Sequence, residues 1–134
     1  MIGNLITNST NMLERGLDAS WLRQETILNN VANVDTPGFK SSGVSFEERF
    51  ASAVKGQTFV GRRTRAQHIE IGESAGGVKP LVVRTNDAAL RADGNNVDIE
   101  GEMTNLAKNG IYYSSMISKV SSQFSRLRTA ISGR

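Results

Sequence analysis

The last third of the chain carries apolar residues at alternating intervals of three and four positions. This spacing aligns them along one side of a long helix and is the heptad pattern of coiled coils. The positions are Met103, Leu106, Gly110, Tyr113, Ile117, Val120, Phe124, Leu127 and Ile131. A narrow apolar stripe of this length predicts a helix over residues 98–134 that packs against a partner helix of similar length.

Gly110 is the one position in this stripe without an apolar side chain. Two interpretations are open. Glycine in a helix interior costs about 1 kcal/mol relative to alanine, so Gly110 can be a small local penalty. Alternatively, a neighbouring backbone or a bulky side chain such as Trp21 approaches closely there, which the absence of a Cβ allows.

Residues 1–34 show the same spacing less regularly and predict a second long helix. Its apolar positions are Ile6, Leu13, Leu17, Trp21, Ile27, Leu28, Val31 and Val34. Trp21 and Leu28 lie one residue beyond the main line and widen it on one flank. Because Gly16 also weakens this helix, we expect packing to hold it more than intrinsic propensity does.

A turn follows the first predicted helix. The run Asp35–Gly38 predicts a change of chain direction, because the residue before a proline avoids helical backbone angles and Pro-Gly favours a turn. Phe46, Phe50 and Val54 then stand four residues apart. This spacing predicts a short amphipathic helix within residues 35–56.

Residues 57–97 lose this periodicity and contain repeated glycines. Short β-like runs remain only at 68–71 and 81–83, so we expect a loop-rich middle with at most one hairpin. The predicted fold is mainly α. Long N- and C-terminal helices pack as an antiparallel coiled coil, joined by a middle with little β structure, in a single domain over residues 1–134.

The composition indicates that apolar side chains are buried mainly between subunits of an assembly, and not in a large hydrophobic core within one subunit. Hydrophobic residues make up 38% of the chain, but aromatic residues make up only 6%, so large core anchors are few. The formal net charge of +3 and a pI near 9.6 speak to solubility and identify no partner. The chain has no cysteine, which excludes a disulfide framework and a thiolate metal site.

The N-terminus lacks the basic segment and the following apolar segment of a cleaved secretion signal. No apolar run approaches the roughly eighteen residues that a membrane helix needs. We therefore expect no cleaved signal and no transmembrane segment.

Some local patterns resemble chemical sites, but each is incomplete. Gly72–Gly76 fits the G-x-S-x-G nucleophile elbow, yet the only histidine, His68, precedes the serine, and a lone histidine does not make a zinc site. Asp93–Asp98 resembles a calcium loop, but Val97 and Asp98 stand where a ligand and a glycine are required. We expect no catalytic residue, no metal, no cofactor and no small-molecule substrate.

One basic cluster, Arg62, Arg63 and Arg65, lies beside Phe59 and has the chemistry to touch a phosphate backbone. Nucleic-acid binding would also call for a recognition helix or several stacking aromatic residues, and the sequence predicts neither. We favour a solvated loop or a contact to acidic neighbours in an assembly. A basic helical nucleic-acid-binding protein is the alternative from a different class.

The turn region resembles a signature of bacterial flagellar axial proteins, the rod, hook and hook-junction subunits. The residues that match its N-x-A-N-x-x-T-P-G-aromatic form are Asn30, Ala32, Asn33, Thr36, Pro37, Gly38 and Phe39. The family often has tyrosine where Phe39 stands. This motif by itself indicates only the axial superfamily.

A second segment narrows the resemblance. The run from Asp93 to Glu100, followed by Glu102-Met103 and matching positions through Ile131, is similar to the C-terminus of the FlgB family of proximal rod proteins. Thr64 with His68-Ile69 also fits a Thr-x-x-x-His-Ile element common in that family. FlgC, the other short proximal rod protein, usually differs after the acidic-Met pair, and a FlgC-like subunit is the nearest alternative.

The resemblance implies a structural subunit of the rod next to the cytoplasmic membrane, in the shaft that transmits torque to the hook and filament. It implies as partners further copies of the chain, rod proteins of the FlgC, FlgF and FlgG types, the adaptor FliE, the membrane ring FliF and the export gate. It also implies flagellar type III export to the periplasmic side. We expect the apolar positions of both terminal helices to form the assembly interface: Leu13, Leu17, Trp21, Ile27, Leu28 and Val31, with the C-terminal stripe from Met103 to Ile131.

Overall fold

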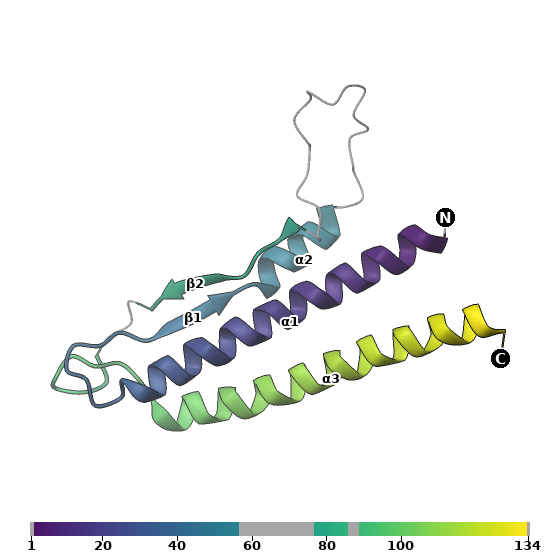
Figure 1. Cartoon of the computed structure of the whole chain (residues 1–134). Helices are drawn as coiled ribbons and strands as arrows, with labels where there is room; N and C mark the ends of the chain where they lie inside the picture. Colours follow the sequence, from purple (N-terminus) through teal and green to yellow (C-terminus); the bar gives the residue numbers. More distant parts are fainter. Residues whose placement is uncertain (1, 57–76, 86–88, 134) are drawn as a thin grey trace.

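The computed structural model describes residues 2–56, 77–85 and 89–133, with side chains from residue 9 onward. Its elements are α1 (Ile2–Ala32), β1 (Ser42–Ser45), α2 (Glu47–Gly56), β2 (Leu81–Arg84) and α3 (Ile99–Ser132). In Figure 1, α1 has α3 along one side and the β1–β2 ribbon with α2 along another, and both chain termini lie at the same end of the molecule. The predicted mainly helical fold with antiparallel terminal helices is confirmed.

The ends of α3 carry well-formed caps. Asp98 has extended backbone angles, and its Oδ1 accepts a hydrogen bond of 3.1 Å from the backbone N–H of Glu100, which satisfies one of the open donors of the first turn. Gly133 adopts the left-handed conformation with φ 67°, and its N–H donates to the carbonyl oxygen of Thr129. None of the 34 residues between these caps is proline, so α3 runs without a break.

Helix α1 ends at Ala32, two residues before the predicted end at Val34. The chain tightens here, since the N–H of Asn33 donates to Asn30 O at 3.1 Å and the N–H of Val34 donates to Val31 O at 3.3 Å. These are three-residue turns in place of the four-residue turns of the α-helix. The predicted reversal at Asp35–Gly38 follows directly.

The β1–β2 ribbon differs from the predicted hairpin. Strand β2 contains the predicted run 81–83, but its antiparallel partner is β1, with Ser42 opposite Arg84 and Ser45 opposite Leu81. The sequence did not predict β1, which has one apolar residue in four. The other β-like run, at 68–71, lies outside the described residues.

A small core lies between α1, α2 and the ribbon. It consists of Ala19, Phe46, Ala53 and Val78, with Met12, Val44 and Phe50 packed against it. The rings of Phe46 and Phe50 are stacked, with centroids 5.1 Å apart. Val54, the third position of the predicted α2 stripe, is 40% exposed and lies outside this core. The core fixes α2 and the ribbon on one side of α1.

Across the described part of the chain, no helix combines the length and the apolar character that a bilayer span requires.

Candidate assembly interface

The face of α3 that packs on α1 forms a heptad line of its own, which we call the inner stripe. Its members are buried or half-buried: Glu102, Leu106, Asn109, Tyr113, Met116, Val120, Gln123 and Leu127. Four of the predicted apolar positions belong to it, namely Leu106, Tyr113, Val120 and Leu127. Its alternate positions are Glu, Asn, Met and Gln. The interface within the subunit is therefore more polar than the predicted stripe.

Three of these polar residues make hydrogen bonds across the helix pair, and we call these contacts the polar rungs. Asn30 Nδ2 donates to Glu102 Oε1 at 2.9 Å, and Asn109 Nδ2 donates to the carbonyl oxygen of Ser20 at 2.9 Å. Toward the free ends, Gln123 bonds to the hydroxyl groups of Ser9 and Thr10. The rungs fix the axial register of α1 against α3 at three heights.

Two groups of these rungs, the Glu102 carboxyl and the Asn109 Oδ1, are buried in surroundings that destabilise them. Burial raises the pKa of Glu102 above 4.5, the hydrogen bond from Asn30 opposes that rise, and the nearby Asp98 carboxylate adds to it. Asn109 is 1% exposed, and its Oδ1 has no hydrogen-bond partner among the described residues. A buried acceptor without a donor is destabilising, so Asn109 contributes to register more than to stability.

A close neighbour from the opposite helix lies over Gly16 and not over Gly110. A Cβ built on Gly16 would lie 2.7 Å from Met116 Sδ, whereas a Cβ on Gly110 would meet nothing within 4 Å. The hypothesis that Gly110 receives a close neighbour such as Trp21 is therefore wrong within the subunit. Gly110 lies on the outward side of α3, and the notch that admits a bulky side chain is on α1.

The remaining predicted positions of α3 are exposed, and we call them the outer stripe: Met103, Gly110, Ile117, Phe124 and Ile131. The first four each follow an inner-stripe residue by one position, which is about 100° around the helix. Phe124 is 59% exposed and Ile131 is 86% exposed. On α1, Trp21 and Leu28 are likewise exposed, Ile27 is buried, and Leu13, Leu17 and Val31 are half-buried. The predicted interface residues thus divide into an inward and an outward set.

The turn of the axial motif is held by Asn95, for which the sequence predicted only a place in a later turn. Asn95 is completely buried, and its Nδ2 lies 2.9–3.0 Å from the carbonyl oxygens of Asn33, Val34 and Thr36. These oxygens belong to the end of α1 and the turn after it, where helical partners are missing. Asn95 therefore caps α1 from a segment that directly precedes α3.

Asparagines also attach β1 to α1, and the residue before β1 to the segment that precedes α3. Asn30 exchanges two hydrogen bonds with the backbone of Ser42, at 2.8 and 3.0 Å. Asn96 Oδ1 accepts from the N–H of Ser41 at 2.7 Å. We call the region formed by these asparagines the junction. It joins the two sequence motifs, from 30–39 and 93–98, in one structural unit.

Two glycines allow the backbones to meet in the junction. Gly38 and Gly94 have φ of 69° and 85°, and a Cβ on Gly94 would lie 3.6 Å from Gly38 Cα. The N–H of Gly38 donates to Asp93 O at 2.9 Å. Arg91 adds an exposed ion pair to Asp35 at 3.0 Å. The remaining motif residues Ala32 and Pro37 are exposed, and Phe39 is half-buried.

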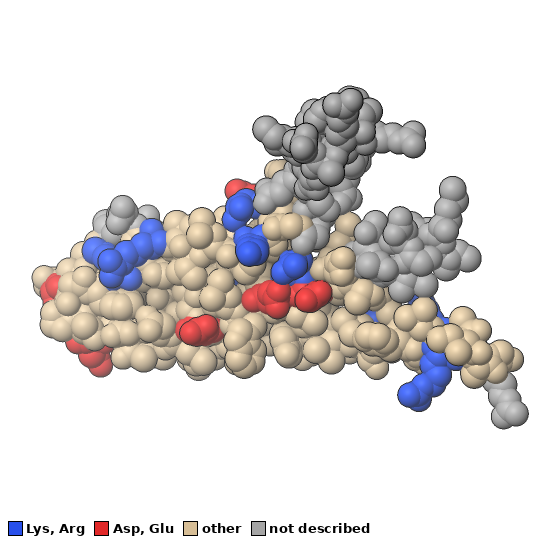
Figure 2. Space-filling view, turned by 45° about the horizontal axis from the view of Figure 1, so that its top comes forward, with Lys and Arg blue, Asp and Glu red and all other residues tan. Residues whose placement is uncertain are grey.

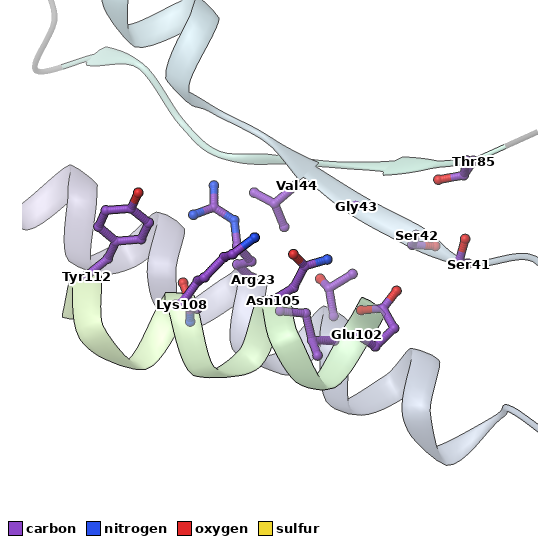
Figure 3. A pocket seen from close by; sticks show the side chains of 13 residues that line it. Arg23, Ser41, Ser42, Gly43, Val44, Thr85, Glu102, Asn105, Lys108 and Tyr112 are labelled. Carbon is purple, nitrogen blue, oxygen red and sulfur yellow. The ribbon is translucent and has the colours of Figure 1, made fainter. Parts of the chain in front are cut away.

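A groove runs between α1 and α3 on the side that carries β1 and α2. One section, of about 370 Å³, is lined by residues that include Ile27, Val44 and Lys108. A second, more apolar section of about 560 Å³ is lined by residues that include Phe50 and Lys119. Arg23 and Tyr112 line both sections. Figure 3 shows Lys108 and Tyr112 projecting from α3 on the side that faces β1.

On the face shown in Figure 2, residues other than Lys, Arg, Asp and Glu cover most of the described surface, and the charged side chains form small separate groups. A surface of this kind is suited to contact with protein neighbours along its length. The arginine cluster at 62–65, the serine of the G-x-S-x-G match and His68 lie outside the described residues.

The comparisons with known proteins agree with this geometry. The family described as flagella basal body rod protein matches residues 11–40, which span most of α1 and the turn after it. The FlgB flagellar basal body rod protein of Borrelia hermsii is 36% identical over 83% of this chain and 86% of its own length. That of Bacillus subtilis is 29% identical over 97% of this chain and 98% of its own length, and that of Aeromonas hydrophila is 30% identical over 83% of each.

The fold, its uncovered apolar stripe and these matches define a structural component of the flagellar basal body. Within that class, the chain belongs to the FlgB family of basal body rod proteins. The resemblance read from the sequence is thereby confirmed, and the FlgC-like alternative is not favoured. The family is one of structural proteins and not of enzymes.

Proposed function

We propose that this chain is a subunit of the proximal rod, in the shaft that carries motor torque to the hook and filament. The outer stripe is the observation that carries the proposal. It places Met103, Ile117, Phe124 and Ile131 on one side of a 34-residue helix, each at least 44% exposed. A soluble subunit gains nothing from such a line in water, whereas an assembly buries it.

In this proposal the two sets of interface residues act at different levels. Ile27, Leu106 and the other inward residues hold α1 against α3 inside one subunit. Trp21, Leu28 and the outer stripe pack on helices of neighbouring subunits. At 1.5 Å per residue, α1 and α3 are on the order of 45–50 Å long, so each subunit contributes a long wall segment to a tube.

The partners that suit this role are further copies of the chain and other axial subunits of the FlgC, FlgF and FlgG types. At the membrane end, the adaptor FliE and the ring protein FliF are the proposed neighbours. The subunit would reach the periplasmic side through the flagellar type III export gate, without a cleaved signal. The chain has no cysteine, so it does not depend on disulfide formation after export.

A deletion strain tests the role. Loss of the gene should abolish motility and leave basal bodies without a completed rod, and the unmutated gene should restore both. Normal swimming of the deletion strain would rule out the proposed role. Electron microscopy of purified basal bodies with the tagged subunit should locate it at the membrane end of the rod.

A matched pair of variants tests the outer stripe. Ile117→Asp introduces a charge into the stripe, and Ser118→Asp introduces the same charge one residue further, about 100° around the exposed surface of α3. We expect Ile117→Asp to prevent incorporation into basal bodies at normal expression, and Ser118→Asp to retain it. Equal incorporation of both variants would show that neighbours do not bury the stripe.

A further inference from the structure

We propose that the groove between α1, α3 and α2 receives the outward face of α1 from a second copy of this chain. This inference rests on the proposed function, because it names the partner surface for one side of the assembled subunit. The contact brings the acidic residues and Trp21 of one copy against the lysines and Tyr112 of the next.

The receiving surface is the α3 wall of the groove. Lys108, Tyr112, Ser115 and Lys119 all line it and are all exposed, and their spacing of four, three and four places them on one side of the helix. Neither lysine forms an ion pair among the described residues. The wall is therefore cationic at both ends, with an aromatic ring between.

The floor of the groove is apolar. In the larger section it includes Met12, Ala19, Phe46, Phe50 and Met116. An apolar floor with charged side chains along its edge is suited to an amphipathic helix, whose apolar residues enter while its charged residues remain at the rim.

The outward face of α1 has the complementary chemistry. Glu14, Asp18, Trp21, Glu25 and Leu28 recur at intervals of four and three and are all exposed. Trp21 is 64% exposed and Leu28 is 50% exposed, so two large apolar side chains of this face are open to a partner. Neither Glu14 nor Glu25 has an ion-pair partner among the described residues. This face is acidic with an apolar centre.

The spacing of the two faces matches residue by residue. Glu14 and Glu25 are separated by eleven positions, and so are Lys108 and Lys119, which is about 16 Å along a helix and close to three full turns. In an antiparallel alignment, Glu25 meets Lys108 and Glu14 meets Lys119. The same alignment brings Trp21 opposite Tyr112. Trp21 lies four residues from Glu25 and seven from Glu14. Tyr112 likewise lies four residues from Lys108 and seven from Lys119.

An antiparallel contact between α1 of one copy and α3 of the next is expected when all subunits point the same way along the assembly axis. Within each subunit α3 runs opposite to α1, as Figure 1 shows. If all copies point the same way along an axis, then α1 of any neighbour also runs opposite to this α3. The alignment therefore needs no inversion of one subunit relative to the next.

The two faces lie on different sides of the subunit, so the contact is heterologous. One copy offers its groove to one neighbour and its α1 face to another, and the chain of contacts continues until the rotation closes or forms a helix. In the matched alignment the neighbour's α1 lies at nearly the same height as the subunit's own α1. The contact thus adds copies around the axis more than along it.

Charge reversal tests the proposal in the deletion strain. Lys108→Glu with Lys119→Glu should lower subunit incorporation into basal bodies by about tenfold or more, and Glu14→Lys with Glu25→Lys should do the same, because like charges then face each other. The four changes together should restore incorporation and swimming. A fourfold variant that stays defective would overturn the contact.

The same strains separate this inference from the proposed function. If the unmutated gene restores swimming and the fourfold variant does not, the rod role stands and the contact is wrong. If reversal of the lysines prevents assembly while reversal of the glutamates has no effect, another protein occupies the groove and the contact is again wrong. If the unmutated gene fails to restore swimming, the proposed function itself fails.

Cross-linking gives an independent measurement, because the natural chain has no cysteine. The alignment places Asp18 opposite Ser115, so Asp18→Cys with Ser115→Cys should yield disulfide-linked dimers and longer ladders from oxidised basal bodies. A disulfide needs Cα atoms within about 4.4–6.8 Å. The control, Asn11→Cys with Ser115→Cys, moves one thiol about 10 Å along α1 and should give none. Ladders of equal yield from both pairs, or none from either, would contradict the alignment.

Discussion

Met116 on α3 packs directly over Gly16 on α1, so closely that a Cβ at Gly16 would lie 2.7 Å from Met116 Sδ. Because Gly16 has no side chain, α1 leaves room there for the Met116 side chain of α3. Gly110 on α3 has open space around it and serves no such purpose within the subunit.

These two glycines should respond differently to alanine. Gly110→Ala should stabilise the subunit by about 1 kcal/mol, since it improves helix propensity without a contact to disturb. Gly16→Ala should show no such gain, because the added Cβ displaces the Met116 side chain. Thermal unfolding followed by far-ultraviolet circular dichroism measures both. Equal increases in the melting temperature would show that the close approach is absent.

Asn95→Ala should destabilise the junction. The change removes a buried side chain whose two N–H groups are shared among three carbonyl oxygens at the end of α1 and whose Oδ1 accepts from the N–H of Val97. Each hydrogen bond of this kind contributes about 0.5–1.5 kcal/mol. We expect a loss of about 2–4 kcal/mol in the free energy of unfolding. Asn29→Ala, at an exposed position of α1, is the control and should change little. Denaturant titration measures the free energy of unfolding of both variants. An equal loss in the two would show that Asn95 does not cap α1.

Glu102 should make the subunit less stable as pH rises. Burial raises its pKa above 4.5, so the folded state binds a proton more tightly than the unfolded state does. Stability attributable to this group is greatest below the unfolded pKa and is lost as pH rises through the folded pKa. Glu102→Gln keeps an acceptor for Asn30 and removes the titration. The variant should therefore lose that part of the pH dependence above 4.5, as measured by melting temperature across pH.

Two aspartate variants should separate folding from assembly. Leu106 lies half-buried in the inner stripe and Phe124 is 59% exposed in the outer stripe. Leu106→Asp should lower the melting temperature and block incorporation into basal bodies, because a charge enters the α1–α3 contact. Phe124→Asp should block incorporation and leave the melting temperature nearly unchanged. A similar loss of helix stability in both variants would place Phe124 inside the subunit.

The heptad spacing correctly predicted two long antiparallel helices but not which side of α3 faces α1. Leu106, Tyr113, Val120 and Leu127 belong both to the stripe predicted from the sequence and to the inner stripe, so the apolar spacing is compatible with either orientation of α3. Hydrogen bonds from Asn30 and to Ser20 O select the more polar side. These hydrogen bonds join residues 72 and 89 positions apart in the sequence, so the local spacing of apolar residues does not predict them.

Strand β1 was missed for a related reason. Its sequence has little β propensity. It pairs with β2, and Asn30 and Asn96 hold the backbone of Ser42 and of the preceding Ser41. The Asp93–Asp98 run was correctly expected to contain a turn before α3. The buried role of Asn95 depends on the end of α1, about sixty residues earlier, which only the folded chain brings near.

The polar rungs have a mechanical consequence for a shaft under torsion. Two helices joined by apolar side chains alone can slide by one heptad, about 10 Å, and find equivalent contacts again. Here the same displacement would separate Asn30 from Glu102, Asn109 from Ser20 and Gln123 from Ser9 together, and would drive Met116 off its glycine. We therefore expect the helix pair to resist sliding along its axis, because one heptad step would break all three rungs at once.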